Sequence, residues 1–409
     1  MFNADRILLL VSSTLILCYI GGLFYTKTKI PDILWVLGFG IVLGPVLGYF
    51  DKSLFLTLSP LMSTVALSII LFDAGINVDI TTLMRAMTKA MILSIFTILS
   101  VIIATGYFLF YLLPSSFTLY QGMLLGAMIG GTSTIAVFGV LSGLERLIPD
   151  IEGTRVILMM ESVISDPICI ISSITLIRMI MMPGVSVEDS LKDILYTFVL
   201  SSLLGLGIGQ MWAEVLDKLR GRALNYVMTL AILFPAYIIA ERVIGEGGGP
   251  MAALAFGLMI TNYGYITRKL GVKRNAKIDK KRLREFHEEI TFFIKAFFFV
   301  YVGLIVTISM EYVQIGMMVL GLILFIRFLV VTFVGKVLAF SKEERVLSTL
   351  IYASGLPAFV MSQLPLIYDP GKEHFLNPEI YPNLVMPIVL GTVLFAALTS
   401  PIIAKRILR

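Results

Sequence analysis

Three charged side chains lie in the middle of long apolar segments of the chain. Glu161 and Asp166 lie within an apolar run at 154–182, and Arg327 lies in the middle of another at 313–338. A charge at the centre of a bilayer costs about 3 kcal/mol or more, so such residues are candidates for function. A carboxylate can bind a proton or a cation, whereas arginine keeps its charge and needs a counter-ion. The sequence therefore predicts an ion pair between Arg327 and one of the two acids.

The spacing of the two acids places them in different surroundings. Side chains on a helix advance by about 100° per residue, so Glu161 and Asp166 point about 140° apart. Ser162 shares a face with Asp166, and Ser165 shares a face with Glu161. The two acids can therefore have different partners and different roles.

Other charges lie nearer the ends of apolar runs. Asp73, near the end of the run at 57–76, is either a site residue or an ordinary interfacial acid beside Asp79. Arg178 and Lys295 have long side chains that can reach the membrane surface from within a helix. We assign these two basic residues a structural role.

Apolar runs that could each cross a membrane fill almost the whole chain. Of its 409 residues, 58% are hydrophobic and only 14% are charged, whereas soluble domains carry about 25% charged residues. A spanning helix needs about 20 apolar residues. Thirteen such runs are present, at 6–26, 31–49, 57–76, 88–113, 119–142, 154–182, 193–214, 223–241, 249–265, 287–309, 313–338, 346–368 and 383–404. We therefore predict an all-α polytopic membrane protein with about 13 transmembrane helices.

Two of these runs contain residues that interrupt a helix. The fifth run contains Gly130, Gly131, Thr132, Ser133 and Thr134, and the twelfth contains Ser354, Gly355 and Pro357. Glycine and proline weaken a helix, and hydroxyl groups can satisfy the backbone groups that a break leaves free. The odd offset of seven runs inverts the second half of the chain relative to the first. Paired breaks of this kind are typical of transporters with inverted repeats, which bind their substrate at the middle of the membrane.

The distribution of basic residues indicates the orientation in the membrane. Of the 32 lysines and arginines, 24 lie on one side of the predicted topology, five on the other and three within runs. The positive-inside rule then places the N-terminus outside the cell and the C-terminus in the cytoplasm. We expect the chain to lie in the plasma or inner membrane. The basic segment at 267–286 is interpreted as a cytoplasmic loop and amphipathic helix on anionic headgroups, or as a regulatory segment. Because there are only two cysteines and two histidines, we expect no disulfide framework and no histidine-rich metal site.

Three segments and Arg327 together resemble the monovalent cation/proton antiporter superfamily, in particular its NhaP-like sodium/proton exchanger branch, over essentially the full length. Residues 71–75 are similar to the acid–glycine signature of the third span, and residues 161–167 to the sixth-span motif. Residues 297–304 fit the tenth-span pattern, and Arg327 matches the eleventh-span basic residue that pairs with the glutamate found here at Glu161.

Two positions differ from that branch. Ser165 stands where the family usually has asparagine, and Ser133 stands where it has the aspartate of a Thr-Asp-Pro motif. The sequence at 132–134 is closer to the Ser/Thr-rich segment of the potassium-efflux branch.

The resemblance implies exchange of a monovalent cation for H⁺ by alternating access, with Na⁺ expected first and K⁺ or Li⁺ as alternatives. Asp166 would carry the cation or the proton, and Glu161 would stay ionised beside Arg327. Further oxygen ligands for the cation would come from Asp73, Thr132 and Ser162, supported by Ser165, Ser133 and the ends of the broken helices. Since only Asp166 would titrate, we expect an electroneutral exchange that needs no cofactor and serves pH homeostasis.

The resemblance also implies a homodimer in a lipid bilayer, with no nucleic-acid partner. Helices 1–3 (residues 1–86) and 8–10, which follow a linking helix 7 within 184–309, would form a scaffold for dimerisation. Helices 4–6 (residues 87–183) and 11–13 (residues 310–409) would form a moving core, an assignment that the breaks and buried charges also favour.

Other functional classes fit less well. A K⁺/H⁺ efflux antiporter remains an alternative function. A cation channel is a further alternative, but a channel would not need a titratable acid beside a fixed ion pair. Co-transport of an organic anion would require additional basic residues facing the cavity. An intramembrane aspartyl protease could use Asp73 and Asp166 as a dyad, but neither acid follows the glycine motif of those enzymes, and thirteen spans are too many.

Overall fold

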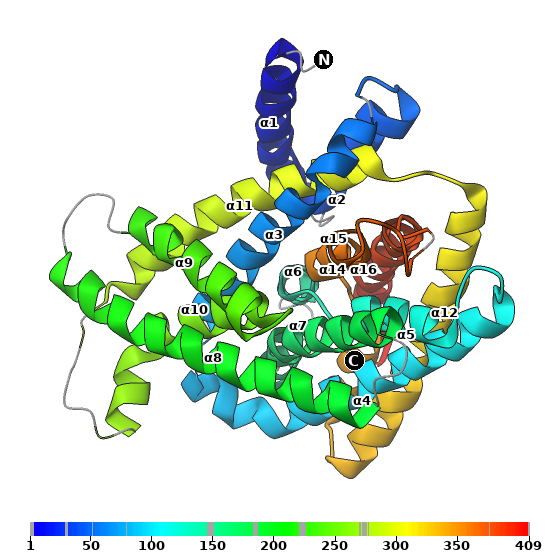
Figure 1. Ribbon diagram of the computed structural model, residues 1–409. Helices are drawn as coiled ribbons and strands as arrows, with labels where there is room; N and C mark the ends of the chain where they lie inside the picture. The colour runs from blue at the N-terminus through cyan, green and yellow to red at the C-terminus, as the bar shows by residue number, and fades with distance from the viewer. Residues whose placement is uncertain are drawn as a thin grey trace. The chain divides into compact units, whose positions relative to one another are not determined.

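The computed structural model describes residues 4–28, 32–50, 52–78, 80–144, 151–182, 187–220, 226–269, 271, 276, 278–375 and 377–407. Helices account for nearly all of this part of the chain, and it contains no β-strand (Figure 1). The prediction of an all-α protein is therefore confirmed. Asp79 and residues 270, 272–275 and 277 of the basic segment lie outside the described residues.

Every predicted apolar run falls on one helix or on consecutive helices. The unbroken helices are α1 (Ala4–Thr28), α3 (Lys52–Asn77), α4 (Ile80–Leu112), α7 (Glu152–Met181), α8 (Val187–Lys218), α10 (Gly248–Lys269), α11 (Lys280–Ile305), α12 (Met310–Val337) and α16 (Ile380–Ile407). Two runs end in a π-helical turn, namely α2 (Asp32–Ile41) with η1 (Val42–Val46) and α9 (Val227–Ile239) with η2 (Ala240–Ile244). The fifth run is split into α5 (Leu119–Ile129) and α6 (Thr134–Leu144), and the twelfth into α13 (Lys342–Leu350), α14 (Leu356–Ser362) and α15 (Leu364–Tyr368).

Length and composition allow six helical segments of the described residues to cross a membrane unaided. They are Thr88–Leu112, Gly153–Met181, Leu195–Lys218, Val227–Ile244, Met310–Val337 and Ile380–Ile403. On α12 the rings of Phe325, Phe328 and Phe333 are more than half exposed, as expected for side chains that face lipid. The chain is a multi-pass membrane protein.

The chain divides into two compact units. Unit 1 comprises Met1–Met62, Ala86–Met181 and Lys295–Arg409, and unit 2 comprises Ser63–Arg85 and Met182–Ile294. The helices α3, α4 and α11 each run from one unit into the other. The assignment of helices to a scaffold and a moving core is not tested by this division and stays a prediction.

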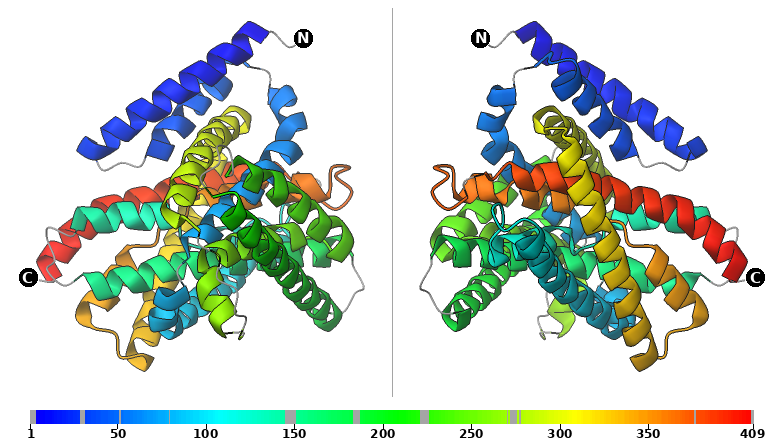
Figure 2. Two further views of the ribbon diagram at one scale, coloured as in Figure 1. Left: turned by 90° about the vertical axis from the view of Figure 1, so that its left-hand side faces the viewer. Right: turned by 90° about the vertical axis from the view of Figure 1, so that its right-hand side faces the viewer.

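Unit 1 is organised around α7 and α16. The helix α7 packs against α5, α6 and α13, and α16 packs against α12, α13 and α14. The crossing of α12 and α16 is visible in Figure 2. Through these contacts, both broken helices of the sequence come to lie in the same unit.

Unit 2 is held together by close contacts between helix backbones. A Cβ atom added at Gly205 of α8 would lie 2.3 Å from the carbonyl oxygen of Ala252 on α10. A Cβ added at Gly257 of α10 would lie 2.4 Å from the carbonyl oxygen of Phe72 on α3. Such contacts are typical of membrane helices that associate through small residues. The side chain of Asn262 then donates to the carbonyl of Val78 at 2.8 Å, which fixes the end of α3.

Candidate ion-binding site

The two broken helices meet at their breaks. The backbone N–H of Ser133 donates to the carbonyl of Ala353 at 2.7 Å, so one break completes the hydrogen bonds of the other. The hydroxyl of Ser354 lies 3.1 Å from the carbonyl oxygens of both Ile129 and Gly131. These bonds satisfy backbone groups that the breaks leave free, as burial requires.

Local sequence explains where each break ends. The helix α6 begins at Thr134, after the carbonyl of Ser133 has accepted the N–H of Val137 at 2.9 Å. The helix α14 begins after Gly355, and Pro357 lies in its first turn, where a missing N–H costs nothing. A Cβ added at Gly355 would lie 2.4 Å from the Cβ of Ser133, so glycine permits the close crossing of the two chain segments.

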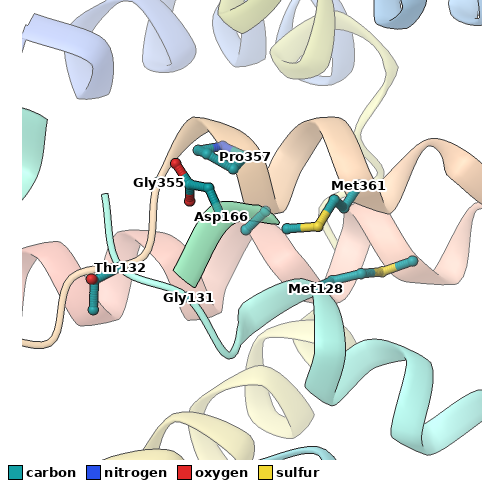
Figure 3. A pocket seen from close by; sticks show the side chains of 8 residues that line it. Met128, Gly131, Thr132, Asp166, Gly355, Pro357 and Met361 are labelled. Carbon is teal, nitrogen blue, oxygen red and sulfur yellow. The ribbon is translucent and has the colours of Figure 1, made fainter. Parts of the chain in front are cut away.

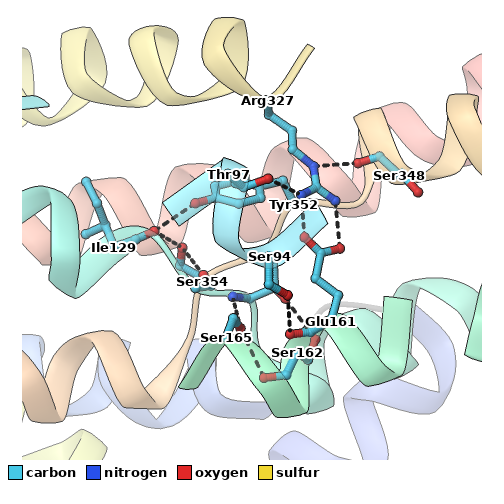
Figure 4. Close-up of polar contacts among 12 residues, drawn as sticks. Ser94, Thr97, Ile129, Glu161, Ser162, Ser165, Arg327, Ser348, Tyr352 and Ser354 are labelled. Carbon is cyan, nitrogen blue, oxygen red and sulfur yellow. Dashed lines mark hydrogen bonds and ion pairs between the residues drawn. The ribbon is translucent and has the colours of Figure 1, made fainter. Parts of the chain in front are cut away.

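Arg327 and Glu161 form a buried ion pair beside this crossing (Figure 4). Their side chains are 0% and 2% exposed. The guanidinium binds both carboxylate oxygens, with Nη2 at 2.8 Å from Oε2 and Nη1 bonded to Oε1. Nη1 also donates to the hydroxyl of Thr97 at 3.1 Å, and Nε donates to the carbonyl of Ser348 at 2.7 Å. The partner of Arg327 is thus Glu161, and the other acid is left for a different role.

Asp166 lies on the same helix as Glu161, but in separate surroundings. It is 9% exposed and lines a narrow pocket together with residues of both breaks and of α5 and α14, namely Met128, Gly131, Thr132, Gly355, Pro357, Ala358 and Met361. In Figure 3 the thioether side chains of Met128 and Met361 lie on the side of Asp166 that faces away from Thr132.

Hydroxyl groups connect Thr132 to the helix that carries Asp166. The hydroxyls of Thr132 and Ser162 are 2.9 Å apart, and both residues are buried. The hydroxyl of Ser165 accepts the backbone N–H of Thr132 at 3.2 Å and donates to the carbonyl of Ser162 at 3.0 Å. Ser165 therefore holds the fifth-run break against α7.

Two further predicted site residues, Ser133 and Asp73, make different kinds of contact. Ser133 contributes its backbone N–H to the crossing, as described above, and its side chain lies against Gly355. Asp73 belongs to unit 2, where it is half-buried and Asn77 donates to its Oδ1 at 3.2 Å. Its place relative to Asp166 stays a prediction.

Several residues of the site were not identified from the sequence. Lys295, to which we had assigned a structural role, acts electrostatically on the Asp166 carboxylate. Thr97 lies three residues after Ser94, whose hydroxyl bonds the Glu161 carbonyl at 3.3 Å. Hydroxyls at this spacing within an apolar run were the available signal for these two residues. Ser348 contributes only its backbone carbonyl to the ion pair, and no side-chain pattern could have indicated that contact.

The sequence matches one known protein family over nearly its whole length. The family described as "Sodium/hydrogen exchanger, transmembrane" matches residues 12–409 of the chain. The chain belongs to this family. The sodium/hydrogen exchangers are transporters rather than enzymes, as the sequence predicted.

Relatives within this family include antiporters named for either Na⁺ or K⁺. A probable Na⁺/H⁺ antiporter 2 of Methanocaldococcus jannaschii is 24% identical over 289 residues, which cover 69% of this chain and 65% of that protein. The Na⁺/H⁺ antiporter ApNhaP of Aphanothece halophytica is 25% identical over 74% of this chain and 54% of its own length. The K⁺/H⁺ antiporter NhaP2 of Shewanella sp. strain ANA-3 is 27% identical over 82% of this chain and 57% of its own length. The chain thus spans between about half and two thirds of these relatives.

The fold is that of a solved antiporter. The structure of MjNhaP1 from Methanocaldococcus jannaschii at pH 8 matches with a TM-score of 0.82 over 100% of both chains, at 19% sequence identity. At this level of identity the match shows the fold alone, and it confirms the predicted fold class.

Proposed function

We propose that the chain exchanges a monovalent cation for H⁺ across the membrane by alternating access, with Asp166 as the group that carries both. The observation that supports this most strongly is the buried Asp166 carboxylate at the crossing of two broken helices, in a member of the sodium/hydrogen exchanger family. A single carboxylate cannot hold a proton and a cation at the same time, so the two compete and their movements are coupled.

The surroundings of Asp166 fit a hard alkali cation. Such ions take oxygen ligands rather than sulfur or nitrogen. The Thr132 and Ser162 oxygens lie beside the pocket, and we propose that they bind the cation together with Asp166. Among the described residues, no group of three or more His, Cys, Asp or Glu side chains could hold a metal ion.

The charge balance supports electroneutral exchange. Glu161 is committed to Arg327, and neither needs to change its charge during transport. If Asp166 alone alternates between a proton and a cation, one cation replaces one proton in each cycle.

We propose Na⁺ as the cation, because the family and two of the relatives above carry that name. K⁺ is the second candidate, since other relatives are named K⁺/H⁺ antiporters and the break at 132–134 is rich in hydroxyls. The remaining proposals are a homodimer, a cell-membrane location with the N-terminus outside and the C-terminus in the cytoplasm, and a scaffold and moving core divided as the resemblance implies.

The direct test replaces the carrier without changing its shape. In proteoliposomes with a pH-sensitive dye, Asp166→Asn should abolish cation-dependent proton movement, whereas Na⁺, K⁺ and Li⁺ tested separately with the unchanged protein identify the cation. Asp369→Asn is a matched control, because Asp369 is also buried in unit 1, but its carboxylate accepts backbone N–H groups of its own loop and lies 3.9 Å from Nδ1 of His374. Exchange at the wild-type rate by Asp166→Asn would contradict the assignment.

A further inference from the structure

Tyr352 is a buried residue of the twelfth-run break that contacts both the ion pair and the crossing (Figure 4). Its side chain is 0% exposed. The Cζ atom of Arg327 lies 5.3 Å from the centre of the tyrosine ring, within the range of a cation–π contact. Its hydroxyl donates to the carbonyl of Ile129, the last residue of α5, at 3.0 Å. One side chain thus spans from the charged pair to the broken helix.

The contact with Arg327 differs from the hydrogen bonds around it. Those bonds hold the edge of the guanidinium, through Glu161, Thr97 and the Ser348 carbonyl. The guanidinium carbon instead lies over the face of the Tyr352 ring, a contact that none of these hydrogen bonds supplies. Because the pair is buried, this contact is not weakened by water.

The contact with Ile129 reaches the site itself. The carbonyl of Ile129 lies three residues before Thr132, whose oxygens we propose as cation ligands. This carbonyl receives two hydroxyls, those of Tyr352 and of Ser354. A shift of the Tyr352 ring would therefore move the end of α5 and, with it, the distance between Thr132 and Asp166.

We propose that Tyr352 is a positioning residue that ties the Glu161–Arg327 pair to the crossing of the broken helices and so keeps Thr132 in place for the cation at Asp166. This rests on the proposed function. The Glu161–Arg327 pair then affects the affinity for the cation as well as the stability of the fold, and it does so through its contact with Tyr352.

The test compares two tyrosines that donate to the same helix. Tyr381 of α16 is also buried and donates to the carbonyl of Gln121 near the start of α5, at 3.3 Å and far along the helix from the break. Tyr352→Phe and Tyr381→Phe each remove one buried hydroxyl from a carbonyl of α5. We expect similar losses of melting temperature in detergent, but only Tyr352→Phe should raise the KM for Na⁺ in proteoliposomes, by about three- to tenfold. Its kcat should change less than its KM.

Two further variants separate the two contacts of Tyr352. Tyr352→Leu removes the ring from Arg327 as well, so its KM should exceed that of Tyr352→Phe. Tyr352→Phe combined with Ser354→Ala leaves the Ile129 carbonyl without either hydroxyl, and its effect on KM should exceed the product of the single effects.

The outcomes are distinct. Exchange by the wild type, with a raised KM for Tyr352→Phe and a normal KM for Tyr381→Phe, would support the proposal. Equal KM values for the two phenylalanine variants would overturn the role of Tyr352 and leave the proposed function standing. If the wild type itself does not exchange cations for protons, both proposals are overturned.

Discussion

The interiors of the two units are built in different ways. In unit 1 the centre is polar, because the Glu161–Arg327 pair and the hydroxyls around it occupy the space between α4, α7 and α12. In unit 2 the contacts between α8 and α10 are close backbone contacts at glycines such as Gly205. Lipid gives helices no hydrophobic reason to associate, so membrane proteins rely on these two means, polar bonds and close packing of small residues.

The difference reflects what each interior can support. A buried charge is expensive and tolerates no loss of its partner, but it allows a site to change its charge and its ligands. A seam of glycines carries no charge and tolerates no added volume. We therefore expect unit 1 to be sensitive to the removal of charge and unit 2 to the addition of a single methyl group.

The largest expected effect is on the ion pair. Glu161→Gln or Arg327→Gln leaves an uncompensated buried charge, which should lower the free energy of unfolding by about 3–5 kcal/mol. The double variant should recover part of this loss, as measured by melting in detergent. Lys89–Glu344 is the control pair in the same unit, because the side chain of Lys89 is 35% exposed, so Lys89→Gln should cost about 1 kcal/mol or less. Strictly additive losses at Glu161 and Arg327 would contradict their pairing.

A smaller effect is expected at the glycine seam of unit 2. Gly205 and Gly207 are two residues apart on α8, but a Cβ at Gly207 would meet no atom within 4 Å, whereas one at Gly205 would meet the Ala252 backbone at 2.3 Å. Gly205→Ala should therefore destabilise the protein by about 1–3 kcal/mol. Gly207→Ala should be neutral or slightly stabilising, since alanine favours a helix. Equal melting temperatures for the two variants would show that the seam does not depend on close packing.

Much of this arrangement could be predicted from the sequence, because it depends on local pattern. The thirteen apolar runs predicted the helices, and the helix-breaking residues at Gly130–Thr134 and Gly355–Pro357 predicted the two breaks. The position of Arg327 within an apolar run predicted that it has an acidic partner, although not which of the two acids this is.

The rest depends on contacts between distant segments. The direct bond from Ser133 to Ala353 and the ring of Tyr352 against Arg327 arise only when the broken helices cross at one angle and register. The effect of Lys295 on Asp166 was missed for the same reason, since a lysine near the end of a run usually reaches the surface. Spacing along the chain carries no information on such pairs.

The central claim is that cation and proton compete for Asp166, and initial exchange rates across pH at three cation concentrations test it most directly. At low pH protons fill the site, and at high pH too few protons remain for the return step, so the rate at fixed cation should be bell-shaped. Because the two ligands exclude each other, each tenfold rise in cation should move the acid limb to lower pH by up to about one unit. An acid limb that stays in place as the cation concentration changes would indicate a separate pH sensor and contradict competition at Asp166.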